Sequence, residues 1–256
     1  MLATPDLPPL LAARQALAAR YGVVADIHPQ DFIWHFIRTH PNFSSEEAAL
    51  EYYFSDGARS AQQLAVLLND WYAEPTPYAL LEFAAGYGCV TRHLAGALPH
   101  ARVTACDIHP AAVTFLRETL DTPAVLSNAV PEAAVLGGPY AVVFALSFFS
   151  HMPRATWTRW LHALAAASAP GGLLMFTTHG WASRVHFGEP QVPPDGFWFQ
   201  ATSEQQDLDT ADYGSTVVTP AFVVQQVAPL APAVRLVAFR EAAWWGHQDL
   251  YILRRA

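Results

Sequence analysis

Small residues recur at every second position after an acidic residue in the segment Glu82–Gly88. Ala84, Gly86 and Gly88 leave room for the backbone to approach a bound ligand closely. Asp107 lies 19 residues after Gly88, and a carboxylate at the end of a second strand can accept hydrogen bonds from both hydroxyls of a ribose. The order of these features predicts a ribose-bearing ligand, with a purely structural glycine turn as the alternative.

Two histidines follow later strand-like runs. His151 is expected to end the fourth strand and His179 the fifth, and ligands of doubly wound sheets lie beyond the carboxyl ends of the strands. An imidazole there can act as a general base or orient a reacting group, whereas a hydrogen-bonded structural histidine is the alternative. The other nine of the 11 histidines form no His-x-x-x-His pair with companion acids, so no metal site is predicted.

Short apolar runs alternate with amphipathic stretches from Tyr78 onward, which predicts an α/β fold with a doubly wound, mostly parallel sheet. The expected parallel strands are Ala79–Phe83, Arg102–Cys106, Ala124–Leu126, Tyr140–Leu146 and Leu173–Thr178. Val234–Phe239 and Asp249–Leu253 are close in sequence and favour a terminal hairpin. The long segment Trp181–Thr219 lies before that hairpin, and a connection of this length usually covers a site.

Helical patterns fill the chain before the sheet. Asp31–His40 is predicted as a helix that stops at a proline, and Ser44 with Glu47 has the spacing of a capping box that opens the next helix. That helix is expected to end in a turn at Ser55–Gly57, followed by a third helical segment, Ala58–Leu68.

The proline-containing break Glu74–Pro77 predicts a domain boundary. The expected parts are a helical N-terminal cap over residues 1–77 and a ligand-binding core over residues 78–256. The core contains a lid-like insertion over residues 181–219.

Charge and composition narrow the function. The chain has 22 acidic residues and 14 basic ones, all of them arginine, for a net charge of −8. The absence of lysine excludes a lysine Schiff base and a phosphate-loop lysine, and the scattered arginines favour no nucleic-acid partner. Glycine and proline interrupt the uncharged run Ala133–Pro153, so no membrane helix is expected there. Met1–Arg20 lacks the pattern of a secretory leader, so the expected location is the cytoplasm; the oligomeric state stays open.

The chain resembles the class I S-adenosylmethionine-dependent methyltransferases, over roughly Ala79–Gly180. Glu82–Gly88 resembles the first motif of that family, an acid followed by small residues at alternate positions after a strand. Val103–Ile108 looks like the second strand with its ribose acid, Ala141–Met152 like the fourth strand, and Pro170–Phe176 like the turn into the fifth.

The resemblance implies a seven-stranded sheet of order 3-2-1-4-5-7-6 with the last strand antiparallel, and S-adenosylmethionine as the cofactor. The residues that it assigns to the cofactor are Glu82, Ala84, Gly86, Gly88, Asp107, Ile108, Asn128, Ala129 and Ser147. Family members often have glycine where Ala84 stands and an acid in the third strand, where this chain has Asn128. The carbonyl oxygen of Asn128 could still bind the adenine amine.

The implied function is methyl transfer to a small-molecule acceptor, expected to be a hydroxyl of natural-product or sugar type. His151 matches the family position near the transferring methyl and, with His179, is the catalytic candidate. Two alternatives stay open. Gly86-x-Gly88-x-x-Thr91 is close to the fingerprint of a nicotinamide-dependent dehydrogenase, and a module that binds the cofactor without catalysis fits the same residues.

Overall fold

The computed structural model describes residues 8–72, 76–203, 205 and 207–256. The chain forms two compact units. Unit 1 comprises Met1–Tyr78 and Ala85–Leu126, and unit 2 comprises Ala79–Ala84 and Ser127–Ala256. The division predicted from the sequence, a cap over 1–77 and a core over 78–256, stays a prediction, and residues 74 and 75 of the predicted break lie outside the described part of the chain.

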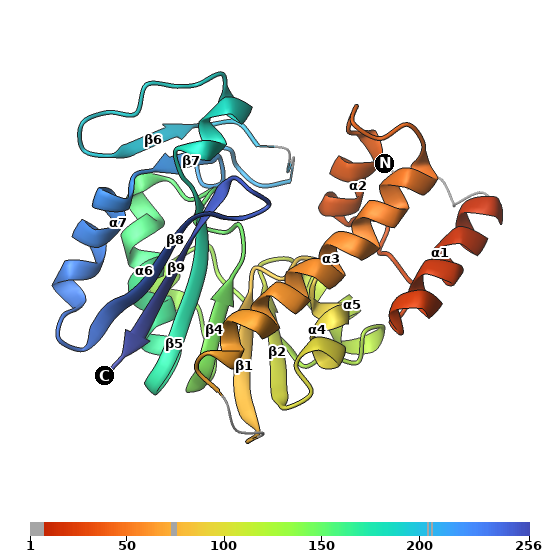
Figure 1. Cartoon of the computed structure of the whole chain (residues 1–256), viewed down its shortest axis with the longest axis horizontal. Helices are drawn as coiled ribbons and strands as arrows, with labels where there is room; N and C mark the ends of the chain where they lie inside the picture. The colour runs from red at the N-terminus through yellow and green to blue at the C-terminus, as the bar shows by residue number, and fades with distance from the viewer. Residues whose placement is uncertain (1–7, 73–75, 204, 206) are drawn as a thin grey trace. The chain divides into compact units, whose positions relative to one another are not determined.

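Three helices open unit 1: α1 (Pro8–Tyr21), α2 (Phe32–Thr39) and α3 (Glu46–Asn69). Both α1 and α2 pack against α3 (Figure 1). The predicted helix at 31–40 is confirmed as α2. Its N-cap is Asp31, whose side chain accepts a hydrogen bond from the Trp34 backbone N–H at 3.1 Å.

The predicted turn at Ser55–Gly57 is wrong, because α3 runs through it without a break. Gly57 is buried inside the helix, and a Cβ there would collide with the carbonyl oxygen of Cys89. The glycine therefore serves a close approach between α3 and a distant loop. The predicted cap is also displaced by one residue: Ser45, not Ser44, is the N-cap and accepts from the Ala48 N–H at 3.2 Å. Two adjacent serines give nearly the same spacing, and only the backbone geometry selects one.

The rest of unit 1 alternates helices and strands. In chain order these are α4 (Thr91–Ala97), β2 (Ala101–Asp107), α5 (Pro110–Glu118) and β3 (Ala124–Leu126). Strands β2 and β3 are parallel, with Asp107 opposite Leu126. The side chain of Arg92, on α4, donates to the carbonyl oxygens of Gly88 at 3.0 Å and of Val24 at 2.8 Å. This buried arginine fastens the segment before α2 to the glycine turn.

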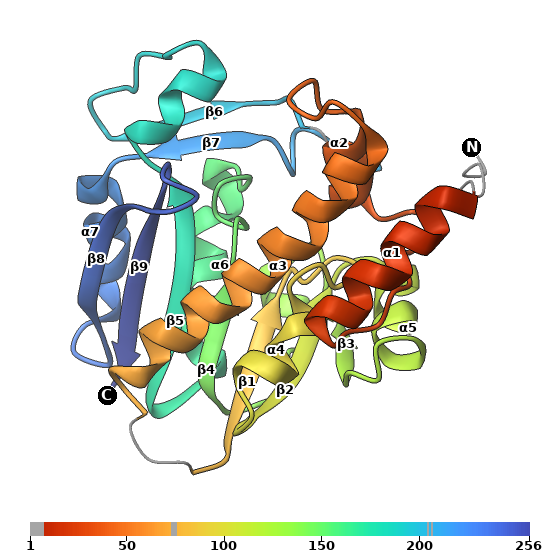
Figure 2. The same cartoon turned by 45° about the vertical axis from the view of Figure 1, so that its right-hand side comes forward.

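The strands of unit 2 include β1 (Tyr78–Phe83), β4 (Tyr140–Ala145), β5 (Ser168–His179), β8 (Val234–Trp244) and β9 (Gln248–Arg255). Pairs β1–β4 and β4–β5 are parallel, and β9 is antiparallel to both β5 and β8. Figure 2 shows β5, β9 and β8 side by side. Helices α6 (Arg154–Ala167) and α7 (Pro220–Val227) pack against β5 and β8, respectively.

The strand order confirms the predicted fold class. The order is β3-β2-β1-β4-β5, followed by β9 and then β8, which corresponds to the expected 3-2-1-4-5-7-6 with an antiparallel final strand. The sheet has nine strands rather than seven, because the segment at 181–219 contributes β6 (Phe197–Gln200) and β7 (Ser215–Val218).

This insertion is joined to the core by its backbone. Strand β7 continues the sheet beside the end of β5, where His179 pairs with Val217. The Thr216 N–H donates to the carbonyl oxygen of Ser150 at 2.8 Å, and its hydroxyl donates to that of Met152 at 2.6 Å. The insertion is thus partly a sheet extension, and its role as a lid stays a prediction. Among the helices that the structure describes, none is both long and apolar enough to cross a membrane.

Candidate active site

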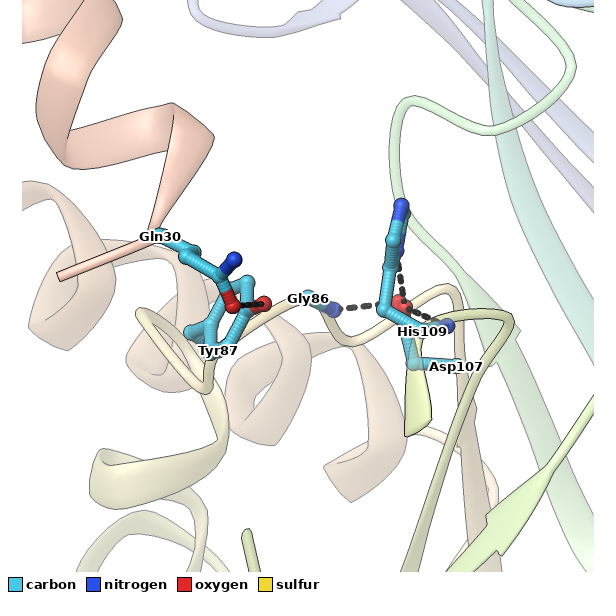
Figure 3. Close-up of polar contacts among 5 residues, drawn as sticks. All are labelled: Gln30, Gly86, Tyr87, Asp107 and His109. Carbon is cyan, nitrogen blue, oxygen red and sulfur yellow. Dashed lines mark hydrogen bonds and ion pairs between the residues drawn. The ribbon is translucent and has the colours of Figure 1, made fainter. Parts of the chain in front are cut away.

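Asp107 ends β2 with its carboxylate held by three donors (Figure 3). Oδ2 accepts from the Gly86 N–H at 2.7 Å, and Oδ1 accepts from the His109 N–H at 3.0 Å. The His109 ring nitrogen Nδ1 lies 2.8 Å from the same Oδ1. The predicted proximity of Asp107 to the glycine turn is therefore present in unit 1.

The turn has the backbone conformation that small residues permit. Gly86 and Gly88 have φ angles of +56° and +80°, in the left-handed region. Nothing lies within 4 Å of the place where a Cβ of Gly86 would stand, so the turn has free space at this point for a ligand. A Cβ on Gly88 would instead collide with the Leu120 side chain, so Gly88 allows the turn to pack closely on the chain after α5.

The segment before α2 flanks this turn. The Tyr87 hydroxyl donates to Oε1 of Gln30 at 3.4 Å, and Figure 3 shows both side chains on the far side of Gly86 from Asp107. The ring of His28 stacks on Tyr87 with centroids 4.4 Å apart. Sequence reasoning missed these neighbours, because nothing in the local pattern couples residues 28–30 to residue 87.

Ile108, Asn128 and Ala129, which were also predicted to bind the cofactor, are less buried than Asp107. In unit 1, Ile108 is half-buried directly after Asp107. In unit 2, Asn128 and Ala129 are exposed, and Oδ1 of Asn128 accepts from the Val130 N–H at 2.9 Å. The proposed adenine contact of Asn128 stays a prediction, and the oxygen that would make it already serves a local turn.

Ala84 and Glu82 complete the strand end in unit 2. Glu82 is buried in β1 opposite Phe144. Ala84 has φ +59°, a conformation that is strained for a residue with a Cβ. This explains in physical terms why a glycine suits this position.

Ser147 belongs to a closed hydrogen-bond cycle that links the chain after β4 to β5 and β9. Its backbone N–H donates to the Thr177 hydroxyl oxygen at 2.8 Å, and that hydroxyl donates to Oε1 of Gln248 at 2.6 Å. Nε2 of Gln248 donates back to the Ser147 hydroxyl oxygen at 2.9 Å. The cycle fixes both the orientation of the Gln248 amide and the position of Ser147.

The two candidate catalytic histidines come together, with ring centroids 6.0 Å apart. Nδ1 of His151 lies 2.8 Å from the carbonyl oxygen of Gly214, and Nδ1 of His179 lies 3.2 Å from that of Thr216. A carbonyl oxygen only accepts, so both Nδ1 atoms donate and each neutral ring keeps its lone pair on Nε2. Tyr213 stacks on the His151 ring with centroids 4.4 Å apart.

The environment of His179 keeps it neutral. Burial lowers the pKa of His179 well below its usual range, and the neighbouring imidazoles of His151 and His247 lower this pKa further. Burial also lowers the pKa of His247, whose Nδ1 lies 3.1 Å from the Ser183 hydroxyl oxygen. Among the described residues, no group of three or more His, Cys, Asp or Glu could hold a metal ion.

The sequence predicted Asp107, His151 and His179 but not the groups that form hydrogen bonds or stacking contacts with them. His109, two positions after Asp107, could have been suspected from proximity alone. Tyr213 and the carbonyl groups of Gly214 and Thr216 could not, because they come from an insertion that carries no recognisable motif.

Comparison with known proteins agrees with this geometry. Residues 81–174 match the family model described as a methyltransferase domain. No curated protein matches the chain significantly. Many solved structures do match the chain.

One is CalS10, an amino pentose methyltransferase from Micromonospora echinaspora bound to S-adenosylmethionine, which is 19% identical with a TM-score of 0.56 over 84% of this chain and 98% of its own. Another is the magnesium protoporphyrin IX methyltransferase of Synechocystis with bound SAH, 12% identical with a TM-score of 0.58 over 87% and 93%. A third is the glycopeptide N-methyltransferase MtfA complexed with S-adenosylmethionine, 16% identical with a TM-score of 0.54 over 78% and 93%.

The strand order and these comparisons define a doubly wound α/β protein with the Rossmann-like methyltransferase fold. More particularly, residues 81–174 are similar to a methyltransferase domain, in agreement with the resemblance to the class I S-adenosylmethionine-dependent methyltransferases that the sequence carries.

Proposed function

We propose that the protein transfers a methyl group from S-adenosylmethionine to a small-molecule acceptor. The observation that carries the proposal is the carboxylate of Asp107, held at the end of β2 beside a glycine turn that faces free space at Gly86. A fixed acceptor for ribose hydroxyls next to an approachable backbone is what a nucleoside cofactor requires. The proposed cofactor-binding residues are Glu82, Ala84, Gly86, Gly88, Asp107, Ile108, Asn128, Ala129 and Ser147.

The proposed acceptor group is a hydroxyl. When bound, S-adenosylmethionine supplies an electrophilic methyl group. Its sulfur–methyl bond would break as the acceptor oxygen takes the methyl group, and S-adenosylhomocysteine would leave with the bonding electron pair. Nε2 of His151 would take the hydroxyl proton, and the chain would otherwise hold the reactants in line and exclude water. His179, held neutral, orients the acceptor. Support comes from the tautomer that the Gly214 carbonyl imposes on His151.

An amine acceptor is the second candidate. Two of the similar structures are described as an amino pentose methyltransferase and a glycopeptide N-methyltransferase. An amine that is protonated in water also needs a base before it can attack, so the same residues serve either acceptor.

Isothermal titration with S-adenosylmethionine, S-adenosylhomocysteine and NAD tests the cofactor. We expect binding of the first two and none of NAD, whereas binding of NAD alone would establish the dehydrogenase alternative. Turnover is then measured on matched pairs of hydroxy and amino sugars. Methylation of the hydroxy member supports the proposal, methylation of the amino member alone establishes the second candidate, and cofactor binding without turnover of any acceptor favours a binding module.

A further inference from the structure

Trp245 lies at the tip of the β8–β9 hairpin in a strained backbone conformation. Its φ angle is +52°, in the left-handed region, which a bulky residue rarely adopts. The residue is also 40% exposed, so burial of the indole offsets only part of the strain. Asn or Gly would adopt the same conformation at a lower cost. Strain of this kind clusters at functional sites, so the conformation of Trp245 indicates a functional role for its side chain.

A series of rings connects Trp245 with the candidate catalytic histidines of unit 2. The indole stacks on the His247 ring, with centroids 6.1 Å apart and planes at 23°. The His247 ring lies 6.1 Å from that of His179, and the next step, from His179 to His151, is 6.0 Å. Exposure increases along the series, from the buried His151 and His179 through the half-buried His247 to the exposed indole. The rings therefore lead from the proposed place of methyl transfer to the surface.

The outer rings offer an apolar face beside polar edges. The indole of Trp245 presents a broad apolar surface, and the ring of His186, from the insertion, lies 4.7 Å from that of His247. Burial lowers the pKa of His247, and the neighbouring imidazole of His186 lowers it further, which favours the neutral ring. A sugar matches such a surface, because its C–H face can pack on an indole while its hydroxyls bond imidazole nitrogens. A planar aromatic ring would use the indole alone.

We propose that Trp245 binds the methyl acceptor: a sugar ring of the acceptor packs on the indole, while a hydroxyl farther along the same molecule reaches His151. This inference rests on the proposed function, since it names the class of acceptor for that reaction. Three ring-to-ring steps separate Trp245 from His151, so we expect a glycoside of more than one ring. Trp245 holds the acceptor and takes no part in bond formation.

The test measures the binding of methyl β-D-glucopyranoside and of phenol by saturation-transfer NMR, on the whole chain with S-adenosylhomocysteine present. The wild type should bind the glucoside, with the strongest saturation at the C–H protons of its ring. Trp245→Ala should bind it at least about tenfold more weakly, as is typical when a packed tryptophan is removed from a binding site. Equal affinity of the two proteins, including no detectable binding by either, would overturn the proposal. Binding of phenol but not of the glucoside would overturn the sugar class.

Trp245→Asn separates binding from a structural role. Asn tolerates the left-handed conformation, so relief of strain should raise the melting temperature by about 2–4 °C while the glucoside binds as weakly as to Trp245→Ala. A lower melting temperature with unchanged glucoside binding would show that the indole only stabilises the hairpin.

Trp181→Ala is the matched control for these variants. Trp181 is 45% exposed in the insertion and packs under the guanidinium of Arg184 at 5.2 Å, so its removal should leave the affinity for the glucoside unchanged. An equal loss in Trp181→Ala would overturn the assignment to Trp245. Isothermal titration with S-adenosylhomocysteine is a separate measurement, and its failure in the wild type would contradict the proposed function itself.

Discussion

Two neighbouring histidines illustrate how backbone carbonyls set side-chain chemistry. The residues His151 and His179 are 7% and 8% exposed, and each donates through Nδ1 to a carbonyl oxygen of the same insertion. A different partner on Nδ1 would move the lone pair and remove the base. The chemistry of each imidazole therefore depends on a hydrogen bond as much as on the residue type.

Replacement of His151 tests its role as base. His151→Ala should lower kcat by on the order of 10²- to 10⁴-fold, because no base then takes the proton from the hydroxyl of the substrate. The dissociation constant for S-adenosylhomocysteine should stay within about twofold, since the proposed partner of the ring is the acceptor and not the cofactor. His162→Ala, an exposed histidine on α6, is the control. Intact turnover in a folded His151→Ala variant would remove this residue from the mechanism.

Asp249 makes stability depend on pH. It is fully buried, and burial raises the pKa of its carboxyl from 3.8 to about 6. A carboxyl with a raised folded-state pKa favours folding when protonated, and this contribution disappears as pH rises from about 4 to about 6. Asp249→Asn keeps an oxygen for the Ala242 N–H, which Oδ1 accepts at 2.9 Å, and carries no charge.

We expect Asp249→Asn to exceed the wild type in free energy of unfolding by about 2 kcal/mol at pH 8, with the gain shrinking below pH 6. Urea unfolding at several pH values measures this. Parallel curves for the two proteins across that range would contradict the assignment.

At the scale of elements, α3 depends on a glycine that a sequence pattern assigns to a turn. Gly57 lies where α3 meets the carbonyl group of Cys89, with no room for a methyl group. At an unconstrained position in a helix, glycine is less stabilising than alanine. At position 57 the close packing of α3 on the Cys89 carbonyl outweighs this lower helix propensity.

Two glycine-to-alanine changes in helices should therefore have opposite effects. Gly57→Ala should destabilise the protein by about 2 kcal/mol, because α3 must move away from Cys89. Gly96→Ala, in α4, has nothing within 4 Å of the new methyl group and should stabilise by about 0.5–1 kcal/mol. Thermal unfolding of the two variants compares them directly, and a stabilising Gly57→Ala would show that α3 has room to adjust.

At the scale of the molecule, the insertion of unit 2 positions the catalytic candidates. Its backbone holds both imidazoles, and the Thr216 hydroxyl bonds the carbonyl oxygen of Met152 next to His151. The segment at 181–219 therefore orders the site besides extending the sheet.

Loss of this attachment should affect turnover more than cofactor binding. Thr216→Val keeps the shape and removes the hydroxyl, so we expect kcat to fall about tenfold with an unchanged dissociation constant for S-adenosylhomocysteine. Ser215→Ala is the control, because its hydroxyl bonds Thr202 within the insertion and should leave kcat nearly unchanged. An equal fall of kcat in both variants would mean that turnover depends on hydrogen bonds anywhere in the insertion and not on the bond to Met152 in particular.

The sequence by itself determined the parallel α/β sheet and the approach of Asp107 to the glycine turn, whereas the order of the strands was implied by the family resemblance. Alternating apolar runs and amphipathic stretches encode a parallel sheet locally, and the spacing of Gly86 and Asp107 brings two strand ends together, as their 2.7 Å hydrogen bond shows. Only the tertiary structure decided that α3 continues through Gly57 and that an insertion 63 residues away holds Nδ1 of His151. Hydrophobic periodicity and turn signals report on residues that are close together along the chain. The segment that packs against Gly57 and the carbonyl that binds His151 are distant in the sequence, so only the folded structure identifies them.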